Sequence, residues 1–193
     1  MYLCGMKRFA KFILKLFGWK QEGQFPTQYK KLVILEAPHT SNLDYFIGMM
    51  FIYAAGVKVN VIIKKEAFFW PLGKLLKKAG GIPIDREGTK NKVETIAEMF
   101  NKYDKLNLAI TPEGTRSYND TWRKGYYYIA LKAGVPILLT SIDYKYKTGK
   151  YGPVIFPTGD YEKDFKQIEE FYKGVNARYP EKYNLSDMYL KKN

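Results

Sequence analysis

The sequence predicts an α/β fold with a mainly parallel central sheet flanked by helices, preceded by an N-terminal amphipathic helix. Three observations support this prediction. Strand patterns and helical patterns alternate along the chain, which is typical of parallel sheets. Two strand segments, Lys31 to Glu36 and Leu106 to Thr111, are short and mostly apolar, as expected for buried strands. The 193 residues, 46% of them hydrophobic, suffice for one domain with a substantial core.

The first 20 residues have the pattern of an amphipathic helix. Lys7, Lys11 and Lys15 recur every four positions on one side, and aromatic and aliphatic side chains gather on the other. A cationic stripe opposite an apolar one suits the membrane interface, but the same apolar stripe could pack on the core instead. We therefore expect an amphipathic helix within residues 1–22, placed in lipid or against the core, and a single domain over residues 23–193.

The later elements are predicted from local patterns and from residues that start or end helices. Pro71 and Gly73 interrupt a helical pattern, Gly134 ends a helix, and Asp160 caps the last one. After the strand at 31–36, the expected elements in order are a helix from 42, a strand at 57–63, a broken helix at 64–79, a strand at 82–84, a helix at 90–103, a strand at 106–111, a helix at 126–133, strands at 136–143 and 154–156, and a helix to 172.

The formal net charge of +13 is the strongest compositional feature. A surface this basic attracts phospholipid headgroups, nucleic acid, phosphorylated substrates or an acidic carrier protein. One cysteine, Cys4, and one histidine, His39, allow neither a disulfide framework nor a zinc site of the usual Cys/His type. No apolar run approaches the roughly 18 to 20 residues of a membrane-spanning helix, and lysines interrupt any signal-peptide core. We expect a cytoplasmic protein.

The segment after the first buried strand contains His39 and, five positions later, Asp44. Five steps along a helix or a strand put two side chains on nearly opposite faces, so these two meet only if the chain turns between them. The intervening Thr-Ser-Asn favours a turn and a helix cap. An ionised carboxylate beside an imidazole makes a general base. A simpler interpretation is a capping box formed by Ser41 and Asp44, with His39 an ordinary loop histidine.

Two more charged segments follow strands. Arg86 comes after the strand at 82–84, and the loop from Glu113 to Arg116 follows the strand at 106–111. In a parallel sheet these segments and His39 reach the same carboxyl edge, where open α/β sheets bind ligands. Guanidinium groups suit phosphate or carboxylate, and Gly114 lets backbone approach a ligand. Taken separately, Arg86 beside Asp85 is more often a surface ion pair and Glu113-Gly114 more often a turn, and only their convergence favours a binding site.

Four segments, in this order and separation, resemble the motif blocks of the glycerolipid acyltransferase family that includes the lysophosphatidic acid acyltransferases. The resemblance covers residues 31–144, and four ordered blocks are far more specific than one short motif. The fourth block lacks a second proline often found there, so the resemblance does not determine the shape of the acyl groove or the preferred donor. The blocks are His39-Thr-Ser-Asn-Leu-Asp44 (HxxxxD), Gly81-Ile-Pro-Ile-Asp85-Arg86, Pro112-Glu113-Gly114-Thr115-Arg116-Ser117 and Val135-Pro136-Ile137.

The resemblance implies a lysolipid O-acyltransferase that acts on 1-acylglycerol-3-phosphate. His39 would deprotonate the acceptor hydroxyl, Asp44 would orient His39, and the oxygen would attack the thioester of acyl-CoA or acyl carrier protein. A thioester is already activated, so we expect no metal and no cofactor besides this co-substrate. The residues implied to bind the acceptor are Arg86, Glu113, Gly114, Thr115, Arg116 and Lys124.

These features place the expected enzyme on the cytoplasmic face of a membrane, as a peripheral or monotopic protein on anionic lipid. The acceptor could also be another hydroxylated monoacyl lipid, such as an amino-acid lipid. A different class remains open: a basic binding module without catalysis, directed at membrane or nucleic acid. No RNA-binding signature occurs, and the aromatic residues mostly fall within apolar periodic segments, so we expect no nucleic acid partner.

Overall fold

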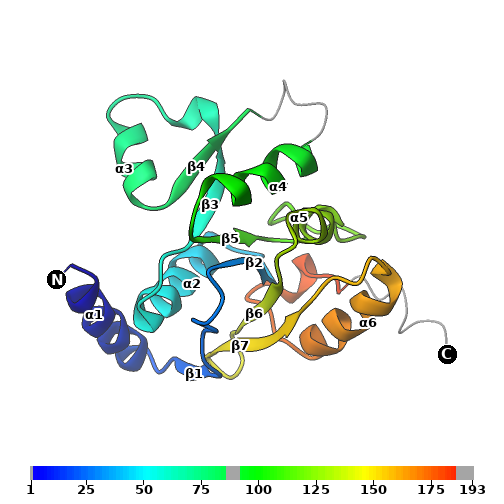
Figure 1. The fold of residues 1–193 in the computed structure, drawn as a ribbon. Coiled ribbons are helices and arrows are strands. Elements are labelled where there is room, and N and C mark those ends of the chain that lie inside the picture. The colour runs from blue at the N-terminus through cyan, green and yellow to red at the C-terminus, as the bar shows by residue number, and fades with distance from the viewer. Residues whose placement is uncertain (1, 86–91, 186–193) are drawn as a thin grey trace.

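The computed structural model describes residues 2–85 and 92–185, which form one sheet between layers of helices (Figure 1). The strands are β1 (Lys20–Glu22), β2 (Lys31–Glu36), β3 (Asn60–Lys64), β4 (Gly81–Ile84), β5 (Leu106–Ile110), β6 (Ile137–Asp143) and β7 (Thr148–Ile155). The helices are α1 (Tyr2–Leu16), α2 (Asn42–Ala55), α3 (Leu72–Lys78), α4 (Lys92–Lys102), α5 (Gly125–Ala133) and α6 (Tyr161–Tyr172), with short 3-10 helices η1 (Lys65–Ala67) and η2 (Pro180–Lys182).

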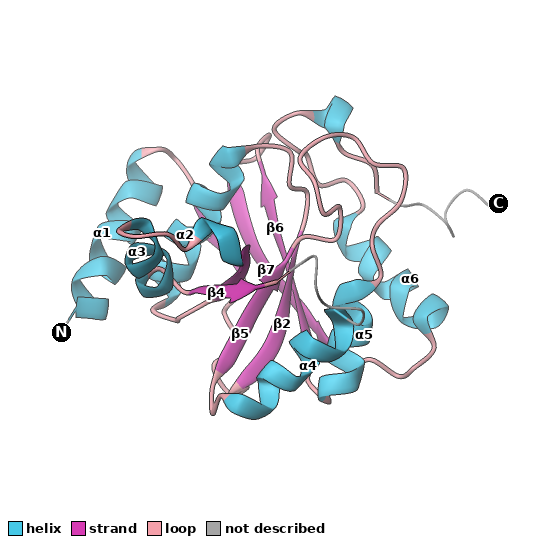
Figure 2. Ribbon diagram, turned by 90° about the horizontal axis from the view of Figure 1, so that it is seen from above, coloured by secondary structure: helices cyan, strands magenta, loops and turns pink. Residues whose placement is uncertain are grey.

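The sheet has the strand order β1-β7-β6-β2-β5-β3-β4. Every neighbouring pair is parallel except β6 and β7, which form an antiparallel hairpin. Seen from above, α1, α2 and α3 lie on one side of the sheet and α4, α5 and α6 on the other (Figure 2). The predicted α/β fold with a mainly parallel, helix-flanked sheet is confirmed. Because the parallel strands end at one edge, the loops after β2 and β5 leave the sheet together.

The start of the chain differs from its prediction. The first helix ends at Leu16 rather than near Lys20, because Gly18 adopts a φ of 74° that a helix cannot continue through. The next residues form β1, which pairs with β7. This strand was not predicted, because its three residues are polar and give no apolar pattern; all three are exposed. Its position depends on the hairpin far along the chain, which local sequence does not specify.

Two further segments were predicted incorrectly. Residues 64–79 contain less helix than expected: the 3-10 helix η1 covers only Lys65–Ala67, and α3 covers only Leu72–Lys78, after a turn at Pro71. The expected break near Pro71 is confirmed. Strand β7 begins at Thr148 rather than 154. The predicted strand was too short because Gly152 and Pro153, which are unfavourable in strands, interrupt the strand pattern.

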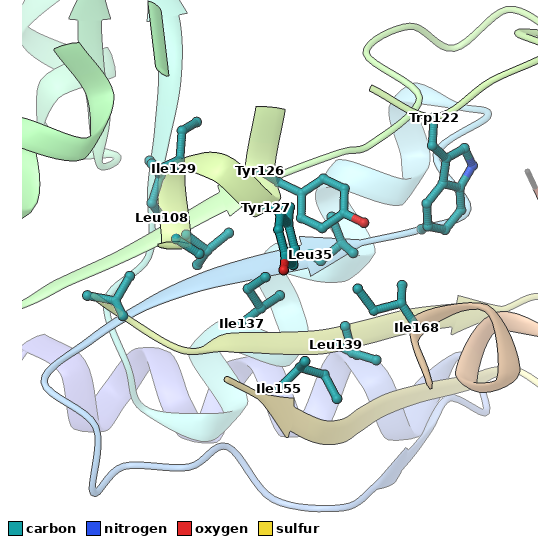
Figure 3. Close-up of a cluster of buried hydrophobic side chains, with 14 of the residues drawn as sticks. Leu35, Leu108, Trp122, Tyr126, Tyr127, Ile129, Ile137, Leu139, Ile155 and Ile168 are labelled. Atoms are coloured by element: carbon teal, nitrogen blue, oxygen red, sulfur yellow. The ribbon is translucent and has the colours of Figure 1, made fainter. Parts of the chain in front are cut away.

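The central strand β2 separates two hydrophobic cores. Val33 and Leu35 point to the side of α4, α5 and α6, while Leu32 and Ile34 point to the side of α1 and α2. In Figure 3, Leu35 lies among Leu139, Tyr126 and Tyr127, in the core between the sheet and α5. Because the four central residues of β2 are buried, with side chains on both faces, the strand is a rigid base for the loop that carries His39.

Helix α1 uses only a narrow face for packing. Its Ala10 and Leu14 are buried in the core beside α2. Of the two alternatives for this helix, packing on the core holds for the face with Ala10 and Leu14, and contact of the opposite face with lipid stays a prediction. Within the part of the chain that the structure describes, no helix has the length and apolarity to cross a membrane. The large exposed side chains of this segment are Phe9, Phe12, Leu16 and Phe17, which are 56–63% exposed.

Candidate active site

Asp44 lies in the first turn of α2 and is completely buried. Its Oδ2 accepts hydrogen bonds from the backbone N–H groups of Thr40, at 2.7 Å, and Ser41, at 2.8 Å. Its Oδ1 accepts one from the hydroxyl of Tyr144, at 2.5 Å. Ser41 accepts from the N–H of Leu43, which completes the predicted capping box. Asp44 therefore has a structural role as part of the cap of α2, independent of any catalytic role.

His39 meets Asp44 across the turn that the five-residue spacing requires. The imidazole Nδ1 lies 3.5 Å from Asp44 Oδ2, and the His39 side chain is 20% exposed. This distance is long for a hydrogen bond, as is common before a substrate binds. With Nδ1 facing the carboxylate, Nε2 is the nitrogen that can accept a proton. The capping box and the imidazole–carboxylate pair coexist, because Asp44 uses backbone donors for the cap and still faces the ring.

The charges around His39 favour its protonation. Burial lowers the pKa of His39, but the interaction with Asp44 and the charges of Glu36 and Glu113 outweigh it and raise that pKa above 6.5. Burial also opposes ionisation of Asp44, yet the contacts from His39, Tyr144 and the backbone of Ser41 and Thr40 lower its pKa below 3.8. Asp44 is therefore ionised at neutral pH, and His39 is a stronger base than a free imidazole.

Two other carboxyl groups lie beside this pair. Glu113 is buried, and its Oε1 accepts a hydrogen bond from the backbone N–H of His39 at 3.0 Å, while no partner is seen for its Oε2 among the described residues. Glu36 ends β2, and its Oε1 fits because Gly48 has no side chain: a Cβ there would approach within 2.7 Å. Burial raises the pKa of both groups to about 7. Both can therefore hold a proton near neutral pH.

His39 opens onto a cleft of about 650 Å³ beside the β3–β4 edge of the sheet. Half of its described lining residues are aliphatic, and its cationic groups come from Lys92 and Arg123, in addition to the polar groups of Glu36 and His39. A second, smaller pocket lies between α2 and the sheet and has a mainly apolar lining, with Glu36, Thr140, Ser141 and Lys150 as its polar exceptions. The two spaces share the lining residues Glu36, Tyr45, Val61 and Ala109. The two spaces therefore offer room for a polar group and for an apolar chain on either side of these shared residues.

The residues predicted to bind the acceptor are placed unequally. Gly114 lines the cleft with a φ of 66°, and Arg123 lies against it: a Cβ on Gly114 would come within 2.8 Å of Arg123 Nε. Glu113 supports the backbone of His39 from behind. Thr115 and Arg116 are exposed and absent from the described lining of the cleft.

The remaining two predicted residues lie elsewhere. Lys124 has its ammonium 4.4 Å from the centre of the Tyr161 ring, outside the described lining of the cleft. Arg86 falls outside the described residues. The roles expected for both in acceptor binding stay predictions.

Four residues of the site were missed by the sequence analysis. Glu36 is the last residue of a predicted strand and has no motif around it. Arg123 lies next to Lys124, the residue that the resemblance implied instead. Tyr144 and Arg178 carry no local signal, since they reach the loop of His39 only through the fold. Among the described residues, no group of three His, Cys, Asp or Glu side chains is arranged to hold a metal ion.

Comparisons with known proteins agree on one family. The family model named Acyltransferase matches residues 20–142. The 1-acyl-sn-glycerol-3-phosphate acyltransferase of Escherichia coli (strain K12) is 33% identical over 131 residues, covering 64% of this chain and 52% of that protein. The enzyme of the same name from Saccharomyces cerevisiae is 30% identical over 117 residues, covering 56% and 38%. This chain therefore spans about half the length, or less, of these relatives.

A solved structure has the same fold. The crystal structure of the 1-acyl-sn-glycerophosphate (LPA) acyltransferase PlsC from Thermotoga maritima matches with a TM-score of 0.59 and 21% identity. The match covers 88% of this chain and 76% of that one. At this level of identity the likeness supports the arrangement of sheet and helices.

Proposed function

This chain belongs to the Acyltransferase family, and on that premise we propose that it transfers a fatty acyl chain from a thioester to the free hydroxyl of 1-acylglycerol-3-phosphate. The observation that carries the proposal is the contact between His39 and the buried, ionised Asp44 at the edge of a cleft with cationic groups. The relatives named above are enzymes of this acceptor class. The donor would be acyl-CoA or acyl carrier protein.

In the first step, Nε2 of His39 takes the proton of the acceptor hydroxyl. The raised pKa of His39 makes this transfer easier, and Asp44 stabilises the imidazolium that forms. Asp44 itself stays ionised, because its backbone and Tyr144 donors hold its charge. General-base assistance of this kind contributes about 10² to 10⁴ in rate.

In the second step, the acceptor oxygen attacks the thioester carbonyl carbon. A C–O bond forms, the C–S bond breaks, and the imidazolium returns its proton to the leaving thiolate. The products are an ester and a free thiol, and His39 is neutral again. No covalent bond to the protein is needed, because the thioester is already activated. The remaining rate acceleration is expected from positioning of the two substrates in the cleft.

The cleft supports an acceptor with an anionic head. Arg123 and Lys92 place two cationic groups along its lining, and a guanidinium can bind a phosphate with two hydrogen bonds. The apolar pocket that shares lining with the cleft suits part of an acyl chain. A phosphate near Glu36 or Glu113 would favour their protonated forms, which their pKa values of about 7 allow.

The membrane is the expected source of the acceptor, and one side of the protein suits it. Trp70 is 80% exposed in the turn before α3, and Phe12 is 62% exposed on α1; both helices lie on the same side in Figure 1 and Figure 2. Exposed lysines surround both segments. Aromatic side chains among lysines favour an anionic lipid surface. We infer peripheral or monotopic binding through this side, with α1 packed on the core by one face and in lipid by the other.

The test of the proposed function is acyl transfer by purified protein and its His39→Ala variant. Labelled acyl-CoA and acyl carrier protein are each offered with 1-acylglycerol-3-phosphate, and with a monoacyl amino-acid lipid as the competing acceptor. Turnover of the first acceptor, lost in His39→Ala at an unchanged thermal unfolding midpoint, supports the proposal. Retained turnover in the variant contradicts the assigned base, and turnover of the amino-acid lipid alone contradicts the assigned acceptor.

Membrane binding is tested separately by flotation with anionic and neutral liposomes. Double replacement Phe12→Ser and Trp70→Ser should reduce flotation with anionic liposomes. The matched control is Tyr146→Ser, since Tyr146 is 64% exposed in the β6–β7 hairpin. Equal flotation of the double variant and the control would contradict this membrane-binding side.

A further inference from the structure

Two residues beyond the family match contact the loop of His39. The match ends at residue 142, whereas Tyr144 follows β6 and Arg178 lies after α6. The Tyr144 hydroxyl donates to Oδ1 of Asp44 at 2.5 Å, on the opposite side of the carboxylate from the oxygen that faces His39. Arg178 Nη1 donates to Oγ of Ser41 at 3.3 Å. Both residues therefore act on the helix cap that carries Asp44.

Tyr144 is held from three directions. Its ring packs edge-on against Trp19, with 5.4 Å between ring centroids. Its backbone N–H donates to the carbonyl of Asn176 at 2.9 Å. The guanidinium of Arg178 interacts with its hydroxyl from the C-terminal segment. The position of this hydroxyl is therefore set by segments from both ends of the chain.

The same C-terminal segment also holds the turn between His39 and Asp44. The N–H of Tyr179 donates to Oγ1 of Thr40 at 3.3 Å. Thr40 and Ser41 are the residues whose backbone N–H groups bind Asp44. The segment after α6 thus contacts the side chains of the two residues that cap Asp44, while Tyr144 contacts the carboxylate itself.

We propose that Tyr144, held by Arg178, is a positioning residue for the His39–Asp44 pair. Backbone donors fix only Oδ2 of Asp44, and the Tyr144 hydroxyl fixes Oδ1, so the plane of the carboxylate is set and Oδ2 faces the imidazole. Burial and Asp44 raise the pKa of Tyr144 above its usual value of 10, against the opposing effect of Arg178, so its hydroxyl remains a donor. The expected change in turnover rests on the proposed function, whereas the contact and the imidazole pKa do not.

Removing the hydroxyl has a defined electrostatic consequence. Tyr144 draws charge from the carboxylate, so Tyr144→Phe leaves more negative charge facing His39 and raises the pKa of the imidazole. The charged and titratable groups facing His39, namely Glu36, Asp44 and Glu113, all remain in place. The charge of Asp44 stays beside the ring, but the plane of the carboxylate is no longer fixed and the imidazole is oriented less precisely toward the acceptor, so kcat falls about tenfold, as for one charge-assisted hydrogen bond, while KM for the acceptor is unchanged.

The chain has a single histidine, so its imidazole can be titrated by NMR without overlap. The protein is labelled at histidine, freed of any histidine tag, and titrated from pH 5 to 9 as wild type, Tyr144→Phe and Tyr127→Phe. Tyr127 is the matched control, because its buried hydroxyl donates to Oδ2 of Asp164 at 2.8 Å, away from His39. We expect the imidazole pKa to rise by about 0.5 in Tyr144→Phe and to stay unchanged in Tyr127→Phe.

A second variant guards against loss of folding. Arg178 is exposed, so Arg178→Met should fold, and it should raise the imidazole pKa in the same direction because it removes a cation and loosens Tyr144. An imidazole pKa equal to wild type in both variants overturns the proposal, as does a shift of equal size in Tyr127→Phe. The titration needs no turnover, so absence of acyl transfer in the wild type would refute the proposed function without touching this contact.

Discussion

The loops after β2 and after β5 reach the same edge of the sheet but are held in opposite ways. The loop after β2 is held by hydrogen bonds: Asp44 is completely buried, and the backbone N–H groups of His39, Thr40 and Ser41 all donate to carboxylates. The loop after β5 is anchored by Glu113 and then becomes exposed at Thr115 and Arg116. A proton-transfer pair needs fixed geometry. A loop that contacts a ligand can stay open until the ligand arrives.

This difference separates the expected effects of substitutions. Changes in the β2 loop should alter the rate of the chemical step, because they act on the base. Changes in the exposed part of the β5 loop should alter acceptor binding. Glu113 belongs to the β5 loop by sequence but supports the β2 loop by contact, so it provides a critical test.

The largest effect is expected from Asp44→Asn. Asparagine caps a helix about as well as aspartate, so the backbone N–H groups of Thr40 and Ser41 keep an acceptor. The negative charge beside His39 is lost, and kcat should fall by about 10² to 10⁴. Steady-state kinetics and the unfolding midpoint measure the two effects. Asp160→Asn, which keeps the cap of α6 away from the site, should leave kcat unchanged. Substantial activity in Asp44→Asn would contradict the assignment of the β2 loop to the chemical step.

Glu113→Gln tests the buried anchor of the β5 loop. Glutamine keeps an acceptor for the N–H of His39 but cannot ionise. The pKa of Glu113 is raised to about 7 in the folded protein, from 4.5 unperturbed. Between about pH 4.5 and 7 the folded state therefore binds more protons than the unfolded state, and stability falls as pH rises through this range. Glu113→Gln should reduce the loss of unfolding free energy between low and high pH by roughly 3 kcal/mol, because glutamine does not ionise.

Urea unfolding at pH 5 and pH 8 measures this effect. The wild type should lose more stability between the two values than Glu113→Gln does. Arg116→Ala is the control from the exposed part of the same loop, and its stability should follow the wild type. Identical pH dependence in wild type and Glu113→Gln would mean that the carboxyl ionises freely, and its proposed burial cost would be wrong.

Arg123→Ala and Arg116→Ala compare a cleft residue with an exposed one. Arg123 lines the cleft against Gly114, whereas Arg116 is exposed and absent from the described lining. Loss of a guanidinium that binds phosphate should raise KM for the acceptor about tenfold in Arg123→Ala, with a smaller change in Arg116→Ala. Kinetics at varied acceptor concentration decide between them. A larger effect in Arg116→Ala would show that the exposed loop closes on the acceptor.

The smallest expected effect is in the pH profile. The base must be neutral to accept a proton, and the pKa of His39 is raised above 6.5. The acid limb of kcat/KM should therefore bend above pH 6.5, and activity should fall as pH drops below that bend. Neutralising Glu36 with Glu36→Gln should move the bend to lower pH, because the charge of Glu36 helps to raise this pKa. A bend at or below 6.5 in the wild type would contradict the electrostatics described here.

Much of the sheet and part of the site could be predicted from the sequence. The buried strands at Lys31–Glu36 and Leu106–Ile110 and the capped helix at Asn42 follow from apolar runs and cap residues, which are local signals. The five-residue spacing also required a turn between His39 and Asp44, and that turn is present. Strand β1 could not be predicted, because its three polar residues pair with a hairpin more than 120 residues away.

The sequence by itself determined the identity of the imidazole and the carboxylate, their meeting across a turn, and the parallel arrangement that carries them to one edge. These depend on residue spacing and on hydrophobic pattern, which act over a few turns of chain. Only the tertiary structure decided that Tyr144 and Arg178 complete the loop, that Glu113 faces His39, and that Arg123 rather than Arg116 lines the cleft. Such contacts join residues that are distant in the chain, and they depend on how whole elements pack.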